Sequence, residues 1–394
     1  MKKVAFYGLK NRSALIRLAQ WLSDRYEICA WIVEDNKVNL RYFSGKPVIS
    51  IEQIRKGGAD NNELFDNIIV AETPESEHIV HKLICAGIEP DKILDWRIGK
   101  NFMFENNIVC LKQRNIFYEG LIFGMSYSYW GLFTLDLDKN FFKLSAPAMD
   151  LYYINKQLQE ILNENYTGFP DRTNSFRSML KYIVLEMPYY MFNYDLSQNK
   201  VHMRKQLILA DYFCDYHNYD IIDNENRKYL EQFTLWKDMF FERLKYNDSY
   251  CYFDHIVRHG SITEEMKKKC KDEISHVWTK RHEETIRENR YVFSKIVKLI
   301  HDFDSNIKLI VLVMPQSKYE YANHAEKIEQ TKIEFESTIT DIMDQYNMKY
   351  YYFDFFKHFF DEDKMFLDLI HLNSHGADVF SKMFDQILEK DVYV

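Results

Sequence analysis

The chain has 394 residues, with 46% apolar and 28% charged side chains and a formal net charge of −8. One hydrophobic core rarely grows past about 250 to 300 residues, so we expect two domains. The acidic balance and the lack of a long Lys/Arg tract exclude the basic surface that phosphate backbones require, so we expect no nucleic acid partner.

The distribution of apolar residues and cysteines indicates a cytoplasmic protein. No window approaches the about 20 apolar residues that span a bilayer, so we expect no transmembrane segment. The first apolar run, Val4 to Leu9, is too short for a signal peptide because Lys10 interrupts it. The six cysteines are scattered without a C-x-x-C pair, as is typical of reduced thiols.

Residues 1–98 alternate short apolar runs with segments of helical spacing. The expected strands are 4–8, 28–33, 65–70 and 92–95, and the expected helices are 13–25, 51–55 and 75–86. Such alternation gives right-handed βαβ units around a parallel sheet. We therefore predict a small Rossmann-like domain of nucleotide-binding type over 1–98, followed by a linker at 99–116.

The turn after the first strand bears on what this domain could bind. It reads GLKNRS over 8–13, with one glycine where a dinucleotide fingerprint has three, which argues against NAD. A helix N-terminus beside two cations could still hold an anion. The candidate anion-binding residues are therefore Gly8, Lys10, Arg12 and Ser13. A purely structural domain is the alternative.

Residues 117–394 repeat the alternation on a larger scale. The expected strands are 118–123, 141–145, 182–187, 307–314 and 349–354, and the expected helices are 150–163, 325–345 and 375–388. The charged stretch at about 195–303 is too long for a structureless loop in a compact domain. We predict a helical insertion there, and an α/β fold class for the whole chain.

The first strand of this region runs into Gly124, Met125 and Ser126. A serine just after a glycine at the carboxyl end of a strand can expose its hydroxyl beside the amides of the next segment, which suits a nucleophile. A serine that caps the following helix fits the same pattern. Ser126 is the candidate nucleophile, and Ser128 takes that role if the turn is offset by two residues.

Far downstream the chain reads DLIHLNSHGA over 368–377. An aspartate three residues before a histidine can accept the imidazole Nδ1 proton and leave Nε2 facing a serine as general base. Asp368 and His371 would therefore supply two members of a catalytic triad from one turn.

These two motifs together, Gly-x-Ser after a first strand and Asp-x-x-His-Leu-Asn-x-x-Gly-Ala before a last helix, resemble the SGNH hydrolase family. The likeness spans roughly 117–394 and is to the branch with teichoic acid D-alanine transfer proteins and exopolysaccharide O-acetyltransferases. It implies a flavodoxin-like, three-layer α/β/α domain. It also implies Ser126 as nucleophile, His371 as base and Asp368 as its orienting carboxylate.

The resemblance further implies an oxyanion site, in the segments SAPAMDLYY after the second strand and LEMPYYMFNYD after the third. The amides of Ser126 and of Ala146 or Ala148 would hold the oxyanion, with Asn193 in place of a missing side-chain donor. The family's third-block Gly-x-Asn-Asp is absent, and Met125 replaces its usual acidic residue. Losing one donor costs about 10² to 10³ in rate, so a degenerate enzyme is the alternative.

Metal and cofactor requirements are not indicated. Histidine pairs such as His255 and His259 lack a third ligand at zinc spacing, so we expect no metal site. The resemblance requires no cofactor, and it leaves open a nucleotide, nucleotide-sugar or acyl-CoA ligand.

The family likeness implies a serine-dependent carbohydrate esterase or O-acyltransferase, transferring acetyl, in bacterial surface polysaccharide or teichoic-acid-like glycan synthesis. The segments GKPVIS, FDNIIVA and LICAGIEPDKI resemble the small domain that accompanies such enzymes, which implies association with other polysaccharide-synthesis proteins. Without an export signal, the expected substrate is a glycan precursor inside the cell. The alternatives are a non-catalytic assembly factor that binds glycan or nucleotide-sugar, and a nucleotide-dependent transferase centred on Lys10 or Arg12.

Overall fold

The chain is an α/β protein with two separate sheets. The computed structural model describes residues 2–8, 26–34, 40–57, 64–70, 76–95, 108, 111, 118–162, 178–198, 210, 213–218, 258–272 and 276–391. These residues divide into two compact units, the first within 1–103 and 210–247 and the second within 104–209 and 248–394.

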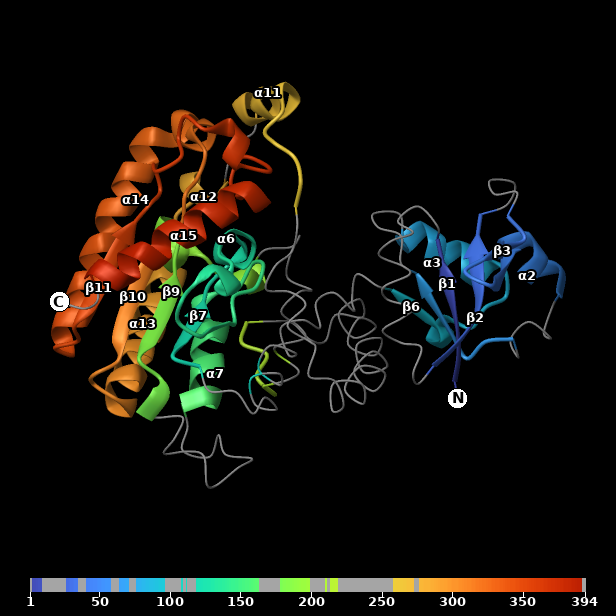
Figure 1. Ribbon diagram of the computed structural model, residues 1–394, viewed down its shortest axis with the longest axis horizontal. Helices are drawn as coiled ribbons and strands as arrows, with labels where there is room; N and C mark the ends of the chain where they lie inside the picture. The colour runs from blue at the N-terminus through green and yellow to red at the C-terminus, as the bar shows by residue number, and fades with distance from the viewer. Residues whose placement is uncertain are drawn as a thin grey trace. The chain divides into compact units, whose positions relative to one another are not determined.

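The first unit contains a six-stranded sheet with β1 at its centre (Figure 1). Its strands, in spatial order, are β3 (Tyr42–Phe43), β4 (Lys46–Ser50), β2 (Tyr26–Val33), β1 (Lys2–Tyr7), β5 (Asn67–Val70) and β6 (Ile93–Asp95). All neighbours are parallel except β3 and β4. Its described helical segments are α2 (Ile51–Gly57), α3 (Ser76–Cys85) and the 3₁₀ turn η2 (Pro90–Lys92).

The apolar runs of this unit form strands because both faces of a parallel sheet are covered by other elements. Ile32, Ile68 and Ile69 are fully buried, and Ile79 and Leu83 of α3 pack close to full burial. Gly8 follows β1 at a φ of 105°, where its amide donates to the carbonyl of Ile32 at 2.9 Å. A glycine adopts that positive φ without the Cβ strain that other residues meet.

The second unit contains a five-stranded, fully parallel sheet. Its strands, in spatial order, are β11 (Tyr350–Asp354), β10 (Lys308–Val313), β9 (Tyr182–Glu186), β7 (Gly120–Phe123) and β8 (Phe141–Lys143). The inner strands are buried on both faces, and Val184, Ile310 and Val311 have no exposed surface. The chain leaves β7 in one direction to form β8 and then crosses β7 again to form β9. Ligands of such sheets bind where that reversal occurs, at the carboxyl ends of the strands.

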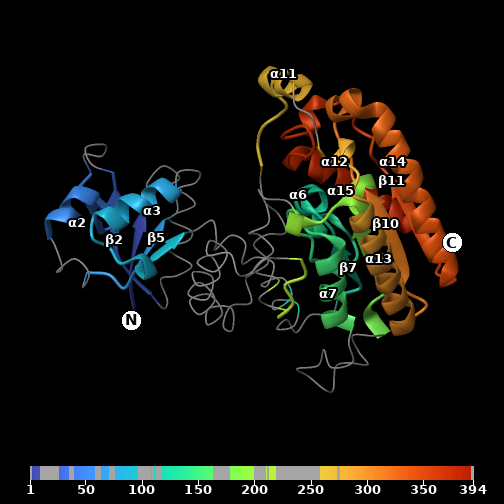
Figure 2. The ribbon, with the colours of Figure 1, turned by 180° about the vertical axis from the view of Figure 1, so that it is seen from behind.

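Helices cover both faces of this sheet. The helices are α6 (Ser126–Gly131), α7 (Leu151–Leu162), α13 (Glu283–Phe303), α14 (Lys318–Gln345) and α15 (Ser374–Asp391). Contacts join α6 to α15, and α13 to both α7 and α14. Figure 1 shows α15 in front of the sheet, and Figure 2 shows α7, α13 and α14 from the opposite side. The sheet is therefore the middle of three layers.

One expectation about helices needs correction. Helix α13 packs against α7 and leads into β10, so it is a core helix and does not belong to the insertion predicted over about 195–303. Helix α13 lies in the core because Phe293, Ile296 and Ile300, which are spaced along one face of the helix, are fully buried. Helix α14 spans Lys318–Gln345 with a kink at His324, whose φ of −134° and ψ of 21° are not helical, so the part after the kink matches the helix predicted over 325–345. None of the described helices combines the length and apolarity that crossing a bilayer takes.

Short elements complete the carboxyl edge of the sheet and the region before α13. The 3₁₀ turns are η3 (Thr134–Asp136), η6 (Tyr189–Asn193), η7 (Leu196–Gln198) and η8 (Asp363–Met365). Two short helices, α11 (Glu264–Asp272) and α12 (His276–Thr279), precede α13. Both η6 and α12 contact α14.

Candidate functional site

The site begins where β7 ends. The strand stops at Phe123, Gly124 and Met125 form the turn, and Ser126 is the first residue of α6. Met125 keeps an extended backbone as the N-cap, with φ −98° and ψ −160°. The chain therefore reverses sharply and presents a partly exposed Ser126 at the carboxyl edge of the sheet.

A closed loop before α15 carries the other two residues of the predicted triad. Phe366 forms an isolated antiparallel bridge with Leu372, and the Leu367 amide donates to the His371 carbonyl at 2.8 Å. The Asn373 amide ties the end of this loop back to the Met365 carbonyl at 2.9 Å. The loop therefore holds Asp368 and His371 rigidly at its tip.

The three predicted residues come together as a hydrogen-bonded relay. The distance from His371 Nε2 to Ser126 Oγ is 2.8 Å, and the distance from His371 Nδ1 to Asp368 Oδ2 is 2.9 Å. These distances lie within hydrogen-bonding range for a nucleophile, base and orienting acid. The side chain of His371 is 16% exposed and that of Asp368 is 34% exposed, so the relay is reachable from solvent.

Asp368 is suited to remain ionised within this relay. Burial alone would raise the pKa of its carboxyl group. Hydrogen bonds from the His371 ring and from the amides of Ile370 and His371 outweigh that effect and lower the pKa below its usual value. An ionised Asp368 keeps the proton of the imidazole on Nδ1, which leaves Nε2 free to accept the proton of Ser126.

Glu186, a residue that the sequence reasoning missed, lies beneath the nucleophile turn. It is fully buried at the end of β9. Its Oε2 accepts the amide of Met125 at 2.6 Å and that of Ser128 at 3.3 Å, and lies 2.9 Å from Ser128 Oγ. Burial raises the pKa of Glu186 to about 7, although these hydrogen bonds favour the ionised form. Its signal in the sequence is one acidic residue that ends the otherwise apolar strand YIVLE.

Ser128 is not the nucleophile. Its side chain has no exposed surface, and its Oγ lies 2.8 Å from Ser145 Oγ as well as close to Glu186. The three side chains form a buried polar cluster below α6. The alternative of a turn offset by two residues is therefore wrong, because an acyl group could not reach Ser128.

The close approach of Glu186 explains why residue 124 is glycine. A Cβ at this position would lie 2.6 Å from both Cβ and Oε2 of Glu186 and 2.7 Å from Ser128 Oγ. We expect Gly124→Ala to lower the free energy of unfolding by about 1 to 3 kcal/mol, the usual effect of overpacking a core. Urea denaturation of the variant and the native protein measures this difference. Equal unfolding midpoints would show that the turn can move away from Glu186.

The expected oxyanion donors are only partly available. The amide of Ala146 donates to the Gly124 carbonyl at 3.0 Å, so its segment lies beside the nucleophile turn but this amide is occupied. Ala148 adopts a left-handed backbone with φ 63°, and its role stays a prediction. The expectation for Asn193 is wrong. Its Nδ2 donates to the Lys280 carbonyl at 2.6 Å, and its Oδ1 accepts the His282 amide at 2.8 Å.

Aromatic side chains connect the triad to the helices beside it. The ring of Tyr127 lies 5.5 Å from that of His371, and its hydroxyl lies 2.7 Å from the hydroxyl of Tyr190. Burial raises the pKa of both phenols, so both remain neutral. Tyr190 in turn packs edge-on against Trp278 at 5.1 Å. These rings form a rigid wall on one side of His371.

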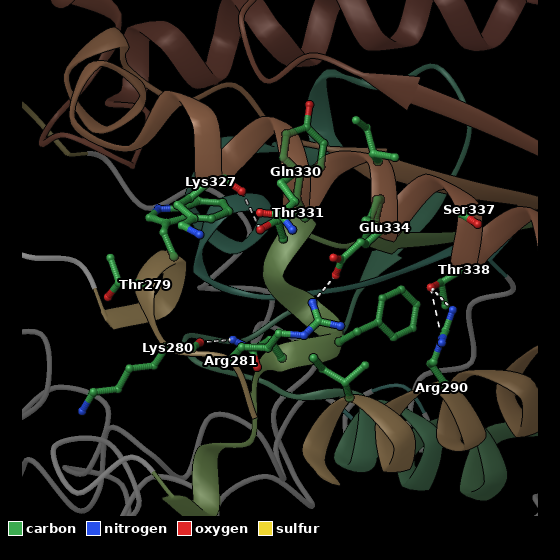
Figure 3. Close-up of a pocket in the computed structure, with 17 residues that line it drawn as sticks. Thr279, Lys280, Arg281, Arg290, Lys327, Gln330, Thr331, Glu334, Ser337 and Thr338 are labelled. Atoms are coloured by element: carbon green, nitrogen blue, oxygen red, sulfur yellow. Dashed lines mark hydrogen bonds and ion pairs between the residues drawn. The ribbon is translucent and has the colours of Figure 1, made fainter. Parts of the chain in front are cut away.

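A pocket of about 350 Å³ lies beyond this wall, between α12, α13 and α14 (Figure 3). Neither the triad residues nor Glu186 line it. Figure 3 shows Arg281 reaching Glu334, and Arg290 reaching Thr338 with Nη2 at 2.9 Å from Oγ1. Both arginines thus already have partners among the residues that line the pocket.

Other candidate ligand sites gain less support. Lys10, Arg12 and Ser13 of the predicted anion site lie outside the described residues, and only Gly8 is described. Among the described residues, the carboxylates of Asp138, Asp385 and Glu389 lie within 4.8 Å of one another. Exposed acidic groups often cluster in this way without a cation, so this cluster does not define a metal site.

Comparison with known proteins adds no family assignment. The chain matches no protein-family model, and a search of curated proteins finds no match. The functional interpretation therefore depends on the geometry of the site and on the resemblance of its motifs.

Proposed function

We propose that this protein is a serine-dependent carbohydrate esterase or O-acyltransferase. The observation that carries the proposal is the relay from Asp368 through His371 to Ser126, with hydrogen-bond distances of 2.9 and 2.8 Å. Ser126 and His371 lie 245 positions apart in the sequence, so the chain must fold specifically to join them. A serine, a histidine and an aspartate joined in this order form the triad of acyl-transfer enzymes on several unrelated folds.

The chemistry follows from the positions of the protons. His371 Nε2 accepts the proton of Ser126 Oγ as the oxygen attacks the carbonyl carbon of an ester. The tetrahedral intermediate then expels the alcohol, which takes that proton from His371, and leaves an acyl group on Ser126. Water or a sugar hydroxyl next gives its proton to His371 and takes the acyl group, and His371 returns that proton to Ser126 Oγ as the ester bond to the serine breaks. Water gives hydrolysis, and a sugar hydroxyl gives transfer.

The amide of Ser126 is our candidate donor to the oxyanion. Glu186 already accepts the amides of Met125 and Ser128, and Ala146 donates to Gly124. Ser126 is the first residue of α6, and first-turn amides of a helix have no partner within the helix. Charge that develops beside this amide would gain the electrostatic stabilisation that acyl transfer requires.

The topology supports a finer assignment of the two domains. Numbered along the chain, the strands of the second sheet run 2-1-3-4-5, which is the flavodoxin-like order. This order and the motifs around Ser126 and His371 favour an SGNH-type domain. The central β1 with parallel neighbours on each side favours a Rossmann-like first domain.

The motif resemblance also supports the substrate class. We infer an acetyl ester of a glycan precursor in surface polysaccharide or teichoic-acid-like glycan synthesis, in the cytoplasm of a bacterium and in association with other proteins of that synthesis. A nucleotide, nucleotide-sugar or acyl-CoA is a candidate ligand of the first domain.

One observation favours a second function, that of a non-catalytic factor binding glycan or nucleotide-sugar. The amide of Ala146 and the side chain of Asn193 are both occupied, so two of the expected oxyanion donors are missing. A protein with an intact triad and too few donors could bind a glycan without turning it over.

A fluorophosphonate serine probe tests the proposal against this alternative. Intact-mass analysis should show one adduct on the native protein and none on Ser126→Ala or His371→Ala, because only an activated serine reacts. Ser337→Ala, which changes an exposed serine of α14, is the matched control and should be labelled like the native protein. Absence of an adduct on the folded native protein would favour the binding factor.

A further inference from the structure

An arginine is fixed beside the triad by the first turn of α15. The amide of Arg258 donates to Ser374 Oγ at 2.5 Å, and the amide of Ser374 donates to the Arg258 carbonyl at 3.0 Å. Two residues on, the Gly260 carbonyl accepts Asn373 Nδ2 at 2.7 Å. Asn373 and Ser374 directly follow the loop that presents His371. The segment that begins at Arg258 is therefore held against the active-site loop at two points.

The guanidinium group lies over the helix that begins at the nucleophile. Its Cζ is 4.3 Å from the centroid of the Trp130 ring. Trp130 lies one helical turn after Ser126 on α6, so the two side chains share a face of that helix. Asp368 also acts on Arg258 electrostatically. These contacts place a positive charge at the rim of the relay, with Trp130 on one side and Asp368 on another.

This charge is poorly compensated within the described part of the chain. Asp368 already accepts hydrogen bonds from His371 and from two amides, and no described carboxylate forms an ion pair with Arg258. Arg258 Nη1 is excluded from solvent without a hydrogen-bond partner among the described residues. Burial correspondingly lowers the pKa of Arg258. Holding a cation in this state costs free energy unless a ligand supplies the missing charge.

We infer that Arg258 is a specificity residue that binds an anionic group, phosphate or carboxylate, on the sugar part of the substrate. This inference rests on the proposed function, because the anion would lie beside an ester held at Ser126. A guanidinium stacked on an aromatic ring keeps its in-plane N–H groups for two parallel hydrogen bonds to such an anion. The chain has a net charge of −8, so attraction of an anionic substrate has to be local.

Binding to Ser126→Ala protein tests this inference without turnover of the ligand. We would compare three sugars with the acetyl group on the same hydroxyl: methyl glucoside, glucose phosphate and methyl glucuronide. A charge-assisted pair is worth about 1.5 to 3 kcal/mol, so calorimetry should show one anionic sugar binding about 10- to 100-fold more tightly than the neutral one. The tighter of the two anionic sugars identifies the group that Arg258 recognises.

The same titrations on double variants assign the preference to Arg258. Adding Arg258→Gln should remove the preference, whereas Arg258→Lys should retain part of it because the charge remains. Arg290→Gln, which changes an exposed arginine of α13, is the matched control and should retain it fully. Equal affinity for all three sugars, or a preference that survives Arg258→Gln, would overturn the inference. A missing probe adduct on native protein would instead count against the proposed function alone.

Discussion

Replacing Asp368 with asparagine should lower kcat for ester turnover by about 10³- to 10⁴-fold while KM changes little. The carboxylate lies 2.9 Å from His371 Nδ1 and accepts a hydrogen bond from the Nδ1–H group. An asparagine can present its NH₂ group to Nδ1 instead, which favours the tautomer with the proton on Nε2. His371 could then no longer accept the proton of Ser126, although the substrate would still bind. Steady-state kinetics of the variant on an acetylated sugar measures both constants.

The loop around Asp368 provides the control for this prediction. Asp368 Oδ1 also accepts the amides of Ile370 and His371, at 3.0 and 2.8 Å, and the carboxamide oxygen of an asparagine can replace those bonds. The variant should therefore fold normally, and its thermal midpoint should stay near that of the native protein. A kcat within tenfold of the native value, in a protein that folds normally, would show that Asp368 does not orient the base.

The contact between Ser126, His371 and Asp368 could be predicted because each of these residues has a local signature. Asp368 and His371 lie three residues apart, and Ser126 follows a strand and a glycine. These short patterns also agree with the positions of the strand ends, which the alternation of apolar and polar runs indicates. Chain topology then brings both motifs to the same edge of the sheet, as parallel strands require.

The surroundings of the triad could not be predicted, because they depend on distant pairings. Glu186 bonds to Met125, which lies 61 residues earlier, and Arg258 bonds to Ser374, which lies 116 residues later. Asn193 is a plausible oxyanion donor by position, but it bonds to Lys280 and His282 beyond a long charged segment. No spacing in the sequence reports on such contacts. The place of α13 in the core could not be predicted for the same reason, because the burial of its apolar face depends on contact with α7.

Glu186→Gln should stabilise the protein at pH 8 and leave its stability near the native value below pH 5. Burial raises the pKa of Glu186 from 4.5 to about 7, so the folded state binds a proton more tightly than the unfolded state between these values. The contribution of this carboxyl to stability is therefore lost as pH rises through that window, and the loss is complete above about pH 7. Glutamine does not titrate and avoids the loss.

The free energy of unfolding of Glu186→Gln should exceed that of the native protein at pH 8 by on the order of 2 to 3 kcal/mol more than it does at pH 5. Urea unfolding midpoints of both proteins at the two pH values measure it. Ser337→Ala, which changes an exposed serine of α14 and removes no titratable group, is the control and should show no such pH dependence. If the difference in unfolding midpoint between the native protein and the variant does not change with pH, Glu186 keeps an ordinary pKa in the folded protein.

A carboxylate that reduces stability at neutral pH and lies under the nucleophile turn implies a positioning role. Hydrogen bonds to a charged acceptor are roughly twice as strong as those to a neutral one, so an ionised Glu186 fixes the amides of Met125 and Ser128 more firmly than glutamine can. We therefore expect kcat of Glu186→Gln at pH 8 to fall by about tenfold, with KM nearly unchanged.

The native kcat should itself decline as pH falls through about 7 and Glu186 becomes neutral, and this part of the decline should be missing in the variant. Tyr127 and Tyr190 are the titratable groups whose pKa Glu186 raises, and both remain neutral, so neither phenol can produce that limb of the profile. Ser126, His371 and Asp368 are the same in both proteins, so subtracting the variant profile from the native one isolates the contribution of Glu186.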